Sequence, residues 1–380
     1  MSHKKLSATA LALVCLLFVT IGALGQQGTG LAPAGRLVEV KIPAPALKGN
    51  QLGEPTELNA SIYLPPGYDT AAPKRYATVY LLHGFLSTDK AWTINGYQRM
   101  NLQTTLDALI KGGKVREMIV VVPNSWSHYG GAFYTNSTVT GNWEDYIYRD
   151  LVQHVDANYR TIASSESRGI AGHSMGGYGA LVLGMRHPDV FGAVYALSPC
   201  CTVMEGDMAG TNPNWSKVLR LTSKDQLKLR PQSFEDFFTI AFVALAASFS
   251  PNPARAPLYV DFPFKEPVST SGSTQAAGLE KNEPTYTRWR SQMAVYMVEK
   301  NQQNLMKLRG LFIDYGVKEE FSHIVIGAQQ LSKTLGERGI PHTLEIYAGG
   351  DHSSKIRERV ETRVFQFFSE RLAGSPPASK

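Results

Sequence analysis

Short apolar runs alternate with segments of helical character along most of the chain. The runs predict strands at residues 37–42, 57–64, 77–82, 118–122, 193–197, 310–315 and 342–347. The other segments predict helices at residues 100–111, 146–158, 178–186, 319–338 and 353–372. Strands and helices in this alternating order are typical of the α/β class, with a mostly parallel sheet covered by helices on both faces.

The alternation stops between residues 202 and 308 and then resumes. This segment holds an apolar helix, a proline-rich stretch, a patch of Ser, Gly and Thr, and a second helix, at residues 234–249, 251–267, 269–275 and 287–308. Because the strand–helix order continues afterwards, we expect an insertion that forms a helical cap over the strand ends. The main domain then extends over residues 37–372.

The first residues of the chain have a different pattern. A basic His3-Lys4-Lys5 precedes the uncharged apolar run 6–24, which ends in Ala23-Leu24-Gly25. This layout is typical of a secretory signal peptide that is cleaved after residue 25. A retained membrane anchor is the alternative, because about 20 apolar residues span a bilayer. The small residues before the cut favour cleavage.

We therefore expect a secreted or periplasmic protein with no membrane span once the signal peptide, residues 1–25, is removed. A flexible leader at residues 26–36 would precede the main domain, and residues 373–380 would form a disordered tail.

The composition is that of an ordinary globular protein of 380 residues, with 43% hydrophobic and 18% charged residues. Cleavage removes Lys4 and Lys5 and no acids, which leaves 36 basic against 32 acidic residues and a net charge of +4. Since the chain has no run of like charges, we expect no nucleic-acid partner. The sequence does not indicate an oligomeric state.

Cys200 and Cys201 are the only cysteines beyond residue 25. Adjacent cysteines rarely bond to each other because the geometry is strained, so the chain is not a disulfide scaffold. The spacing of Cys and His residues indicates no metal site, and we expect no cofactor.

The most informative motif is Gly172-His173-Ser174-Met175-Gly176-Gly177. It lies between a short apolar run at residues 169–171 and a helical segment, the context of a G-x-S-x-G nucleophile elbow. In such an elbow Ser174 is a nucleophile, and the Met175 N–H points toward a developing oxyanion. By itself the pattern equally fits a glycine-rich turn that contains a serine. The interpretation therefore depends on its partners.

A serine nucleophile needs a base, which in proteins with this elbow follows the serine and the acid in chain order. His352 comes directly after the strand 342–347 and ahead of the last helix, so its position indicates the base. His342 precedes that strand, and His323 falls inside a helix.

The acid should follow the strand 310–315. Glu319 lies just past the turn Gly316-Val317-Lys318 and is favoured over its neighbour Glu320 and over Asp314, which is still on the strand. From there a carboxylate reaches the histidine and holds its tautomer. The alternative for either glutamate is an acid at a helix start that interacts with the helix dipole.

A second oxyanion donor is expected in the loop after the strand 77–82, where the sequence reads His83-Gly84-Phe85. Gly84 allows the backbone to approach closely, and the Phe85 N–H would pair with the Met175 N–H around the carbonyl oxygen.

Five stretches together resemble the esterase family of α/β-hydrolases, which includes S-formylglutathione hydrolase (esterase D), feruloyl esterase modules, enterochelin esterases and the antigen 85 mycolyltransferases. They are Tyr63–Asp69, Tyr80–Gly84, Val121–Asn124, Gly141–Glu144 and Ala171–Gly177. The resemblance covers residues 37–200 and 309–372 and implies an α/β-hydrolase fold. Family members with Asp-x-Gly-x-x-Asp carry the triad acid at the last position. Here that position is Glu319, a glutamate as in the antigen 85 group.

The residues and the resemblance together indicate a secreted serine esterase that forms an acyl-enzyme at Ser174. An acyltransferase with the same triad and a non-enzymatic binding protein are the alternatives. Esterase D-like enzymes are cytosolic, which does not fit a signal peptide. The expected partner is a small-molecule or carbohydrate-linked ester.

Aromatic residues in loops at the carboxyl edge of the predicted sheet suggest a cleft for an aryl acyl group or a sugar. They are Trp92, Trp126, Tyr129, Phe133 and Tyr134, of which Trp92, Trp126 and Tyr134 are the predicted substrate-lining residues. Alternatively, these side chains pack the loops against the cap. Residues 237–249 are apolar enough to contact an acyl chain, although a role in the cap core is the simpler interpretation.

Overall fold

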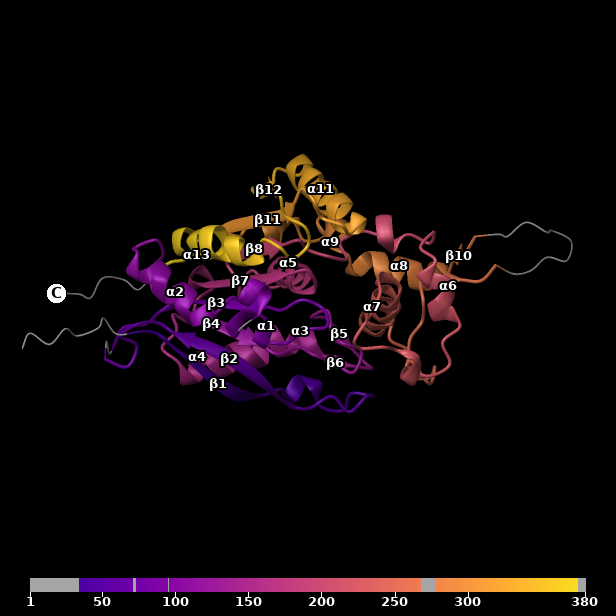
Figure 1. Ribbon diagram of the computed structural model, residues 1–380, viewed down its shortest axis with the longest axis horizontal. Coiled ribbons are helices and arrows are strands. Elements are labelled where there is room, and N and C mark those ends of the chain that lie inside the picture. The colour runs from indigo at the N-terminus through magenta and orange to yellow at the C-terminus, as the bar shows by residue number, and fades with distance from the viewer. Residues whose placement is uncertain (1–33, 71–72, 95, 268–277, 375–380) are drawn as a thin grey trace, which may run out of the picture. The chain divides into compact units, whose positions relative to one another are not determined.

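The structure is a computed structural model that describes residues 34–70, 73–94, 96–267 and 278–374 (Figure 1). The expected signal peptide, residues 26–33 of the leader, the patch 269–275 and residues 375–380 of the tail lie outside the described residues. The leader ends earlier than predicted. Strand β1 begins at Arg36, and the Gly35 N–H donates to Asp107 Oδ1 at 3.0 Å, so these two residues belong to the folded domain.

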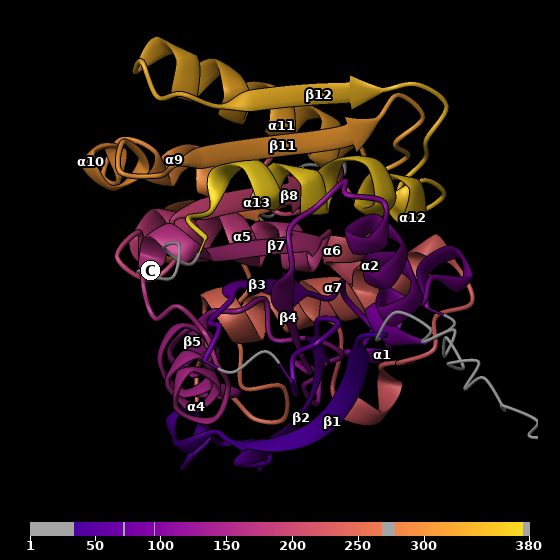
Figure 2. The same ribbon diagram turned by 90° about the vertical axis from the view of Figure 1, so that its left-hand side faces the viewer.

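Eight strands form one sheet in the order β1-β2-β4-β3-β7-β8-β11-β12 (Figure 2). Their bounds are Arg36–Pro43, Glu57–Leu64, Met118–Pro123, Ala77–Leu82, Arg168–His173, Ala193–Leu197, Gly310–Gly316 and Thr343–Tyr347, in that order. Strand β2 is antiparallel to β1 and β4, and the other neighbouring pairs are parallel. The predicted mostly parallel sheet is confirmed, and the carboxyl ends of its parallel strands share one edge.

Successive side chains of the central strands point into two separate apolar layers. Val79 and Leu81 belong to one layer, while Tyr80 and Leu82 belong to the other. Helices cover both layers, so strands β3, β4, β7 and β8 are buried at every position. This explains why these strands read as continuous apolar runs in the sequence.

The first layer packs against α2 (Leu102–Lys111) and against the last helices, α12 (Ile356–Arg359) and α13 (Phe365–Arg371), which a π-helical turn at Val360–Val364 joins. The second layer packs against α4, α5 and α11, with bounds Val152–Asn158, Met175–Arg186 and Ser322–Glu337. Short helices at Lys90–Thr93 (α1) and Trp143–Asp145 (α3) and a π-helical turn at Tyr146–Leu151 complete this part.

Helix α11 begins three residues later than predicted. The chain after β11 therefore has a turn of its own, in which Glu319 and Glu320 precede the helix. These acids do not belong to a first helical turn, and their side chains turn toward the loop after β12.

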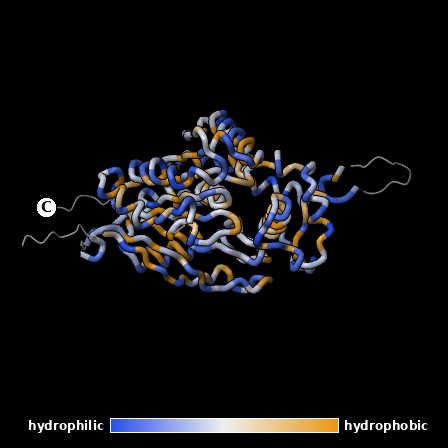
Figure 3. The backbone as a smooth tube through the Cα atoms, in the orientation of Figure 1, coloured by the Kyte–Doolittle hydropathy of each residue, from blue (hydrophilic) through white to orange (hydrophobic). Residues whose placement is uncertain are grey.

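Between β8 and β11 the chain forms helices of which the first three lie together beside the sheet (Figure 1), whereas the last two contact α5. They are α6 (Asn214–Leu219), α7 (Phe234–Phe249), α8 (Glu283–Gln292), α9 (Ala294–Met297) and α10 (Gln302–Leu305), with the two-residue strands β9 (Phe264–Lys265) and β10 (Glu280–Lys281). Hydrophobic residues are concentrated in α7 and in the central strands (Figure 3). Helix α7 is buried from Phe238 to its end. Within the described residues, every helix is too short or too polar to cross a membrane.

The single helix predicted over residues 287–308 is wrong, because the structure has three short helices there. Met293 adopts an extended backbone, with φ −90° and ψ 134°, between α8 and α9. The break turns Met293, Ala294 and Met297 into the core, where all three side chains are buried.

A buried ion pair joins the last two strands of the sheet to the helix that covers them. Asp314 on β11 accepts from Arg359 Nε at 2.8 Å and from the Tyr195 hydroxyl at 2.6 Å. Arg359 also donates to Glu345 on β12 at 2.8 Å. Burial raises the pKa of Asp314 to about 6, although Arg359 and Tyr195 act in the opposite direction. The carboxylate therefore depends on Arg359 for its charge at neutral pH.

We predict that Arg359→Met lowers the free energy of unfolding by about 3 kcal/mol or more at pH 7.5, because it leaves Asp314 buried without its charged partner. Arg363→Met is the matched control, because Arg363 is 52% exposed and contacts the same Glu345. We expect it to cost less than about 1 kcal/mol. Urea unfolding followed by circular dichroism compares them, and equal midpoints for the two variants would contradict the prediction.

Candidate active site

Ser174 stands in a strained turn between β7 and α5. Its backbone has φ 56° and ψ −114°, a region that residues with a side chain rarely occupy. A Cβ added at Gly172 would lie 2.4 Å from the Gly176 carbonyl carbon, and one at Gly176 would lie 2.4 Å from Leu82 O. The two glycines are therefore a steric requirement of the turn. The Ser174 N–H donates to Leu197 O at 2.9 Å, which ties the turn to the neighbouring strand.

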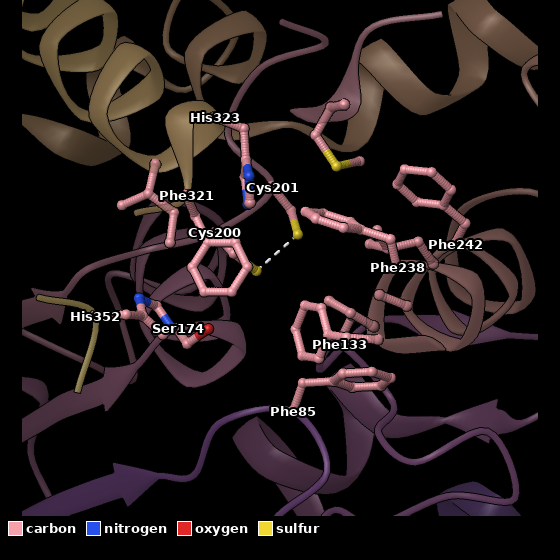
Figure 4. A pocket seen from close by; sticks show the side chains of 15 residues that line it. Phe85, Phe133, Ser174, Cys200, Cys201, Phe238, Phe242, Phe321, His323 and His352 are labelled. Atoms are coloured by element: carbon pink, nitrogen blue, oxygen red, sulfur yellow. Dashed lines mark hydrogen bonds between the residues drawn. The ribbon is translucent and has the colours of Figure 1, made fainter. Parts of the chain in front are cut away.

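His352 and Glu319 meet beside this serine. His352 Nδ1 lies 2.9 Å from Glu319 Oε2, and the glutamate side chain has no exposed surface. Since a carboxylate only accepts, Nδ1 carries the proton and Nε2 is the basic nitrogen. Ser174 and His352 both line one cavity (Figure 4). The structure thus brings together the three residues that chain order had singled out.

The other predicted acids and histidines have different partners. Glu320 accepts from the His352 backbone N–H at 2.9 Å, so it holds the loop and not the ring. Asp314 is paired with Arg359, as described above. His342 lies 2.8 Å from the Ser332 hydroxyl, whereas His323 contacts Asp207 on another wall of the cavity.

His173 holds the backbone of the loop that carries His352, a role that the motif alone did not reveal. Its Nε2 lies 2.8 Å from the His352 carbonyl oxygen and must donate, since a carbonyl only accepts. Burial, and then the nearby His352, lower the pKa of His173 well below its usual range. The ring is therefore neutral, and it holds the backbone of the loop without bringing a charge to the site.

The loop after β3 is held by His83. The Ser125 N–H donates to His83 Nε2 at 2.8 Å, so Nδ1 carries the proton and donates to Gly84 O at 2.8 Å. This carbonyl and the Phe85 N–H belong to the same planar peptide group and point in opposite directions. His83 therefore sets the direction of the Phe85 N–H. The Met175 N–H, in the first turn of α5, lacks a partner within its helix.

Two of the predicted substrate-lining residues support this loop instead. Trp92 Nε1 donates to Leu82 O at 3.2 Å, and the Tyr134 hydroxyl donates to His83 O at 2.8 Å; both side chains are fully buried. Trp126 lines a separate depression with Glu54. The prediction that Trp92, Trp126 and Tyr134 line the substrate site is therefore corrected, because none of the three lines the cavity at Ser174. Buried Tyr and Trp side chains need partners for their polar atoms, and backbone carbonyls behind the loop supply them.

The cavity at Ser174 is nevertheless aromatic. Six phenylalanines from four parts of the chain line it (Figure 4). They are Phe85, Phe133, Phe237, Phe238, Phe242 and Phe321. Of these six, only Phe133 belongs to the group of loop aromatic residues that suggested a cleft in the sequence analysis. The wall from α7 was assigned to the core, since an apolar helix gives no sequence signal that separates a cavity wall from a packed interior.

Comparison with known proteins places the chain in a family. The model of the family described as "Putative esterase" matches residues 52–360. The chain therefore belongs to this esterase family. A curated relative, the endo-1,4-beta-xylanase/feruloyl esterase of Xylanibacter ruminicola, is 29% identical over 136 residues. The match covers 35% of this chain and only 18% of that relative.

Three solved structures share the fold. A ferulic acid esterase has a TM-score of 0.59 at 18% identity, with 90% of this chain and 100% of that chain covered. An S-formylglutathione hydrolase from Agrobacterium tumefaciens has a TM-score of 0.55 at 16% identity, with 90% of this chain and 98% of that chain covered. Fluorophosphonate-binding serine hydrolase F from Staphylococcus aureus has a TM-score of 0.53 at 15% identity, with 88% of this chain and 99% of that chain covered. At these identities the likeness shows the α/β-hydrolase fold.

The neutral His83 makes stability depend on pH. Burial lowers its pKa to about 4, from about 6.5 in an unfolded chain. Between these values the unfolded chain binds the extra proton, so stability falls as the pH drops below 6.5. We predict that His83→Asn, which keeps a donor for Gly84 O, removes about 2 kcal/mol of the stability difference between pH 7.5 and pH 5.0.

Urea unfolding of both proteins at the two pH values measures this change. Other titrating groups, including His173, are common to both proteins and cancel in the comparison. An unchanged pH dependence in the variant would show that His83 binds a proton equally in the folded and unfolded states.

Proposed function

We propose that this esterase hydrolyses carboxylic esters with an apolar acyl group, through Ser174, His352 and Glu319, and that it acts after export. The 2.9 Å contact between His352 Nδ1 and the buried Glu319 carboxylate carries the proposal, because it lies beside a strained serine in an apolar cavity. The basic start and apolar run of residues 1–25 support export.

In the first half-reaction His352 Nε2 accepts the proton of Ser174 Oγ as the oxygen attacks the ester carbonyl. The Phe85 and Met175 N–H groups donate to the oxyanion of the tetrahedral intermediate. Glu319 holds the tautomer and stabilises the imidazolium. The intermediate collapses to an acyl-serine, and the alcohol leaves with the proton from His352. A water molecule, deprotonated by His352, then releases the acid.

The acyl group is expected in the phenylalanine-lined cavity. Most of the side chains that line it are apolar. Such a lining favours an aryl or alkyl chain over a sugar on the acyl side. The name of the curated relative includes feruloyl esterase, which supports an aryl acyl group carried on a carbohydrate or a small alcohol.

We predict that Ser174→Ala abolishes hydrolysis of p-nitrophenyl acetate with the fold intact. Glu319→Gln should lower kcat by about 10³-fold or more, because it removes the charge that orients and stabilises His352. Glu320→Gln is the matched control, with a loss below about tenfold, since Glu320 contacts the backbone N–H of His352 and not its ring. Hydrolysis retained by Ser174→Ala, or equal losses in the two glutamine variants, would overturn the assignment.

The acyl preference can be tested on α7. Phe237 lines the cavity, with its ring 5.4 Å from that of Phe321, so Phe237→Ala should lower kcat/KM for feruloyl and butyryl esters about tenfold more than for acetyl esters. Phe234→Ala is the matched control. The Phe234 ring is on the same helix, but it is 59% exposed and lies outside the cavity. We expect this substitution to leave the ratio unchanged. A uniform loss across acetyl, butyryl and feruloyl esters would argue against acyl binding here.

A further inference from the structure

A second group of reactive side chains lies in the same cavity and has no part in the proposed hydrolysis. Cys200 and Cys201, in the loop after β8, and His323, at the start of α11, line the cavity together with Ser174 and His352 (Figure 4). Asp207 stands behind His323. Export and hydrolysis require none of these four residues, yet all except Asp207 face the space that the substrate would occupy.

His323 links the acid to one thiol. Its Nδ1 lies 2.9 Å from Asp207 Oδ2, and its backbone N–H donates to the same oxygen at 3.2 Å. The His323 ring and the Cys200 thiol line the same cavity and interact electrostatically. Cys200, His323 and Asp207 therefore stand in the relation of nucleophile, base and orienting acid.

The two sulfurs face each other directly. Cys201 Sγ lies 2.7 Å from Cys200 Sγ, and both residues are buried (Figure 4). A disulfide bond measures about 2.05 Å, so the sulfurs need to approach by only about 0.7 Å to bond. Cys201 has φ 57°, in the left-handed region, and this backbone turn brings the neighbouring side chain round to Cys200.

The environment separates the two thiols chemically. Burial alone would raise the pKa of Cys200, but the hydrogen bond from Cys201 and the nearby His323 outweigh it and lower this pKa to about 7. Burial, and then Cys200 itself, raise the pKa of Cys201 well above its usual range. Burial lowers the pKa of His323, but Asp207 and Cys200 outweigh burial and raise it. His352 and Tyr178 are further titratable groups near Cys200.

We propose that Cys200 is a nucleophilic thiol, with His323 as its base and Asp207 as the orienting acid, that reacts with small-molecule disulfides. The Cys200 thiolate attacks one sulfur of the disulfide and forms a mixed disulfide, while the other sulfur leaves and takes the proton held by His323. Cys201 then attacks the Cys200 sulfur, and its proton goes to the second leaving thiolate. The cysteine pair is oxidised, and one small disulfide is reduced to two thiols.

Oxidation of the cysteine pair would displace Ser174 through a backbone hydrogen bond. The Cys200 N–H donates to Ser174 O at 3.2 Å, so a shift of the loop moves the serine. The Cα atoms of adjacent residues are about 3.8 Å apart, below the usual range for a disulfide, so bond formation between them strains the loop. Strained disulfides are readily reduced, which makes the change reversible. This consequence rests on the proposed function, whereas the thiol chemistry does not.

The test exposes the reduced full-length protein to oxidised glutathione and follows the tryptic peptide 187–217, which carries both cysteines, by mass spectrometry. We expect the wild-type peptide to lose two hydrogen atoms while esterase turnover falls at least tenfold, and dithiothreitol should reverse both changes. Cys201→Ser should stop at a glutathione adduct on Cys200, and Cys200→Ser should form no adduct at a comparable rate. A wild-type peptide that keeps both thiols free would overturn the proposal.

The pH profile of the thiol reaction separates a base from a structural residue. In the wild type the rate should reach half its maximum near pH 7. In His323→Gln the midpoint should move toward that of an ordinary thiol, near pH 8.5, with a rate about tenfold lower at pH 7. Asp207→Asn should move the midpoint in the same direction. Unchanged midpoints in both folded variants would contradict the roles of His323 and Asp207.

Ser174→Ala distinguishes this proposal from the esterase assignment. The variant should lose hydrolysis but keep the wild-type rate of disulfide formation at Cys200 and Cys201. Disulfide formation without loss of turnover in the wild type would contradict the coupling to Ser174 and leave the hydrolytic assignment standing.

Discussion

The strained backbone at Ser174 is the constraint on which the rest of the site depends. The strands on either side of β7 both press against this turn: Leu82 O at the end of β3 approaches Gly176, and Leu197 O at the end of β8 accepts from the Ser174 N–H. The loops that follow these two strands must therefore pass beside the serine. One carries His83 and Phe85, and the other carries Cys200.

The turn between β11 and α11, together with the first turn of α11, contributes one residue to each polar cluster of the cavity. Glu319, just before the helix, faces His352, whereas His323, within its first turn, faces Asp207 and Cys200. Phe321 lies between the two in sequence, and its ring is 4.8 Å from that of His352. Apolar side chains from α7 close the opposite wall, so the hydrogen-bonded pair of His352 and Glu319 and the buried thiol pair share one largely apolar cavity.

Chain order was informative because the main strands are buried on both faces and appear as continuous apolar runs. The order Ser174, Glu319 and His352 follows from where those runs end, and the structure places Glu319 and His352 in contact. The same reasoning could not separate Trp92 and Tyr134, which hold the loop after β3, from Phe237, which lines the cavity. All are aromatic, and only the direction of each side chain differs.

The sequence by itself determined the α/β class, the strand positions, the elbow and the chain order of its partners, because periodicity and glycine spacing are local properties. The tertiary structure decided which aromatic residues face the cavity, that the segment 287–308 breaks at Met293, and that Cys200 and His323 line the same cavity. These features arise from contacts between segments far apart in the chain, and no local pattern encodes such contacts. The 2.7 Å approach of the two cysteine sulfurs belongs to the same group, since it depends on how the loop after β8 is held against Ser174.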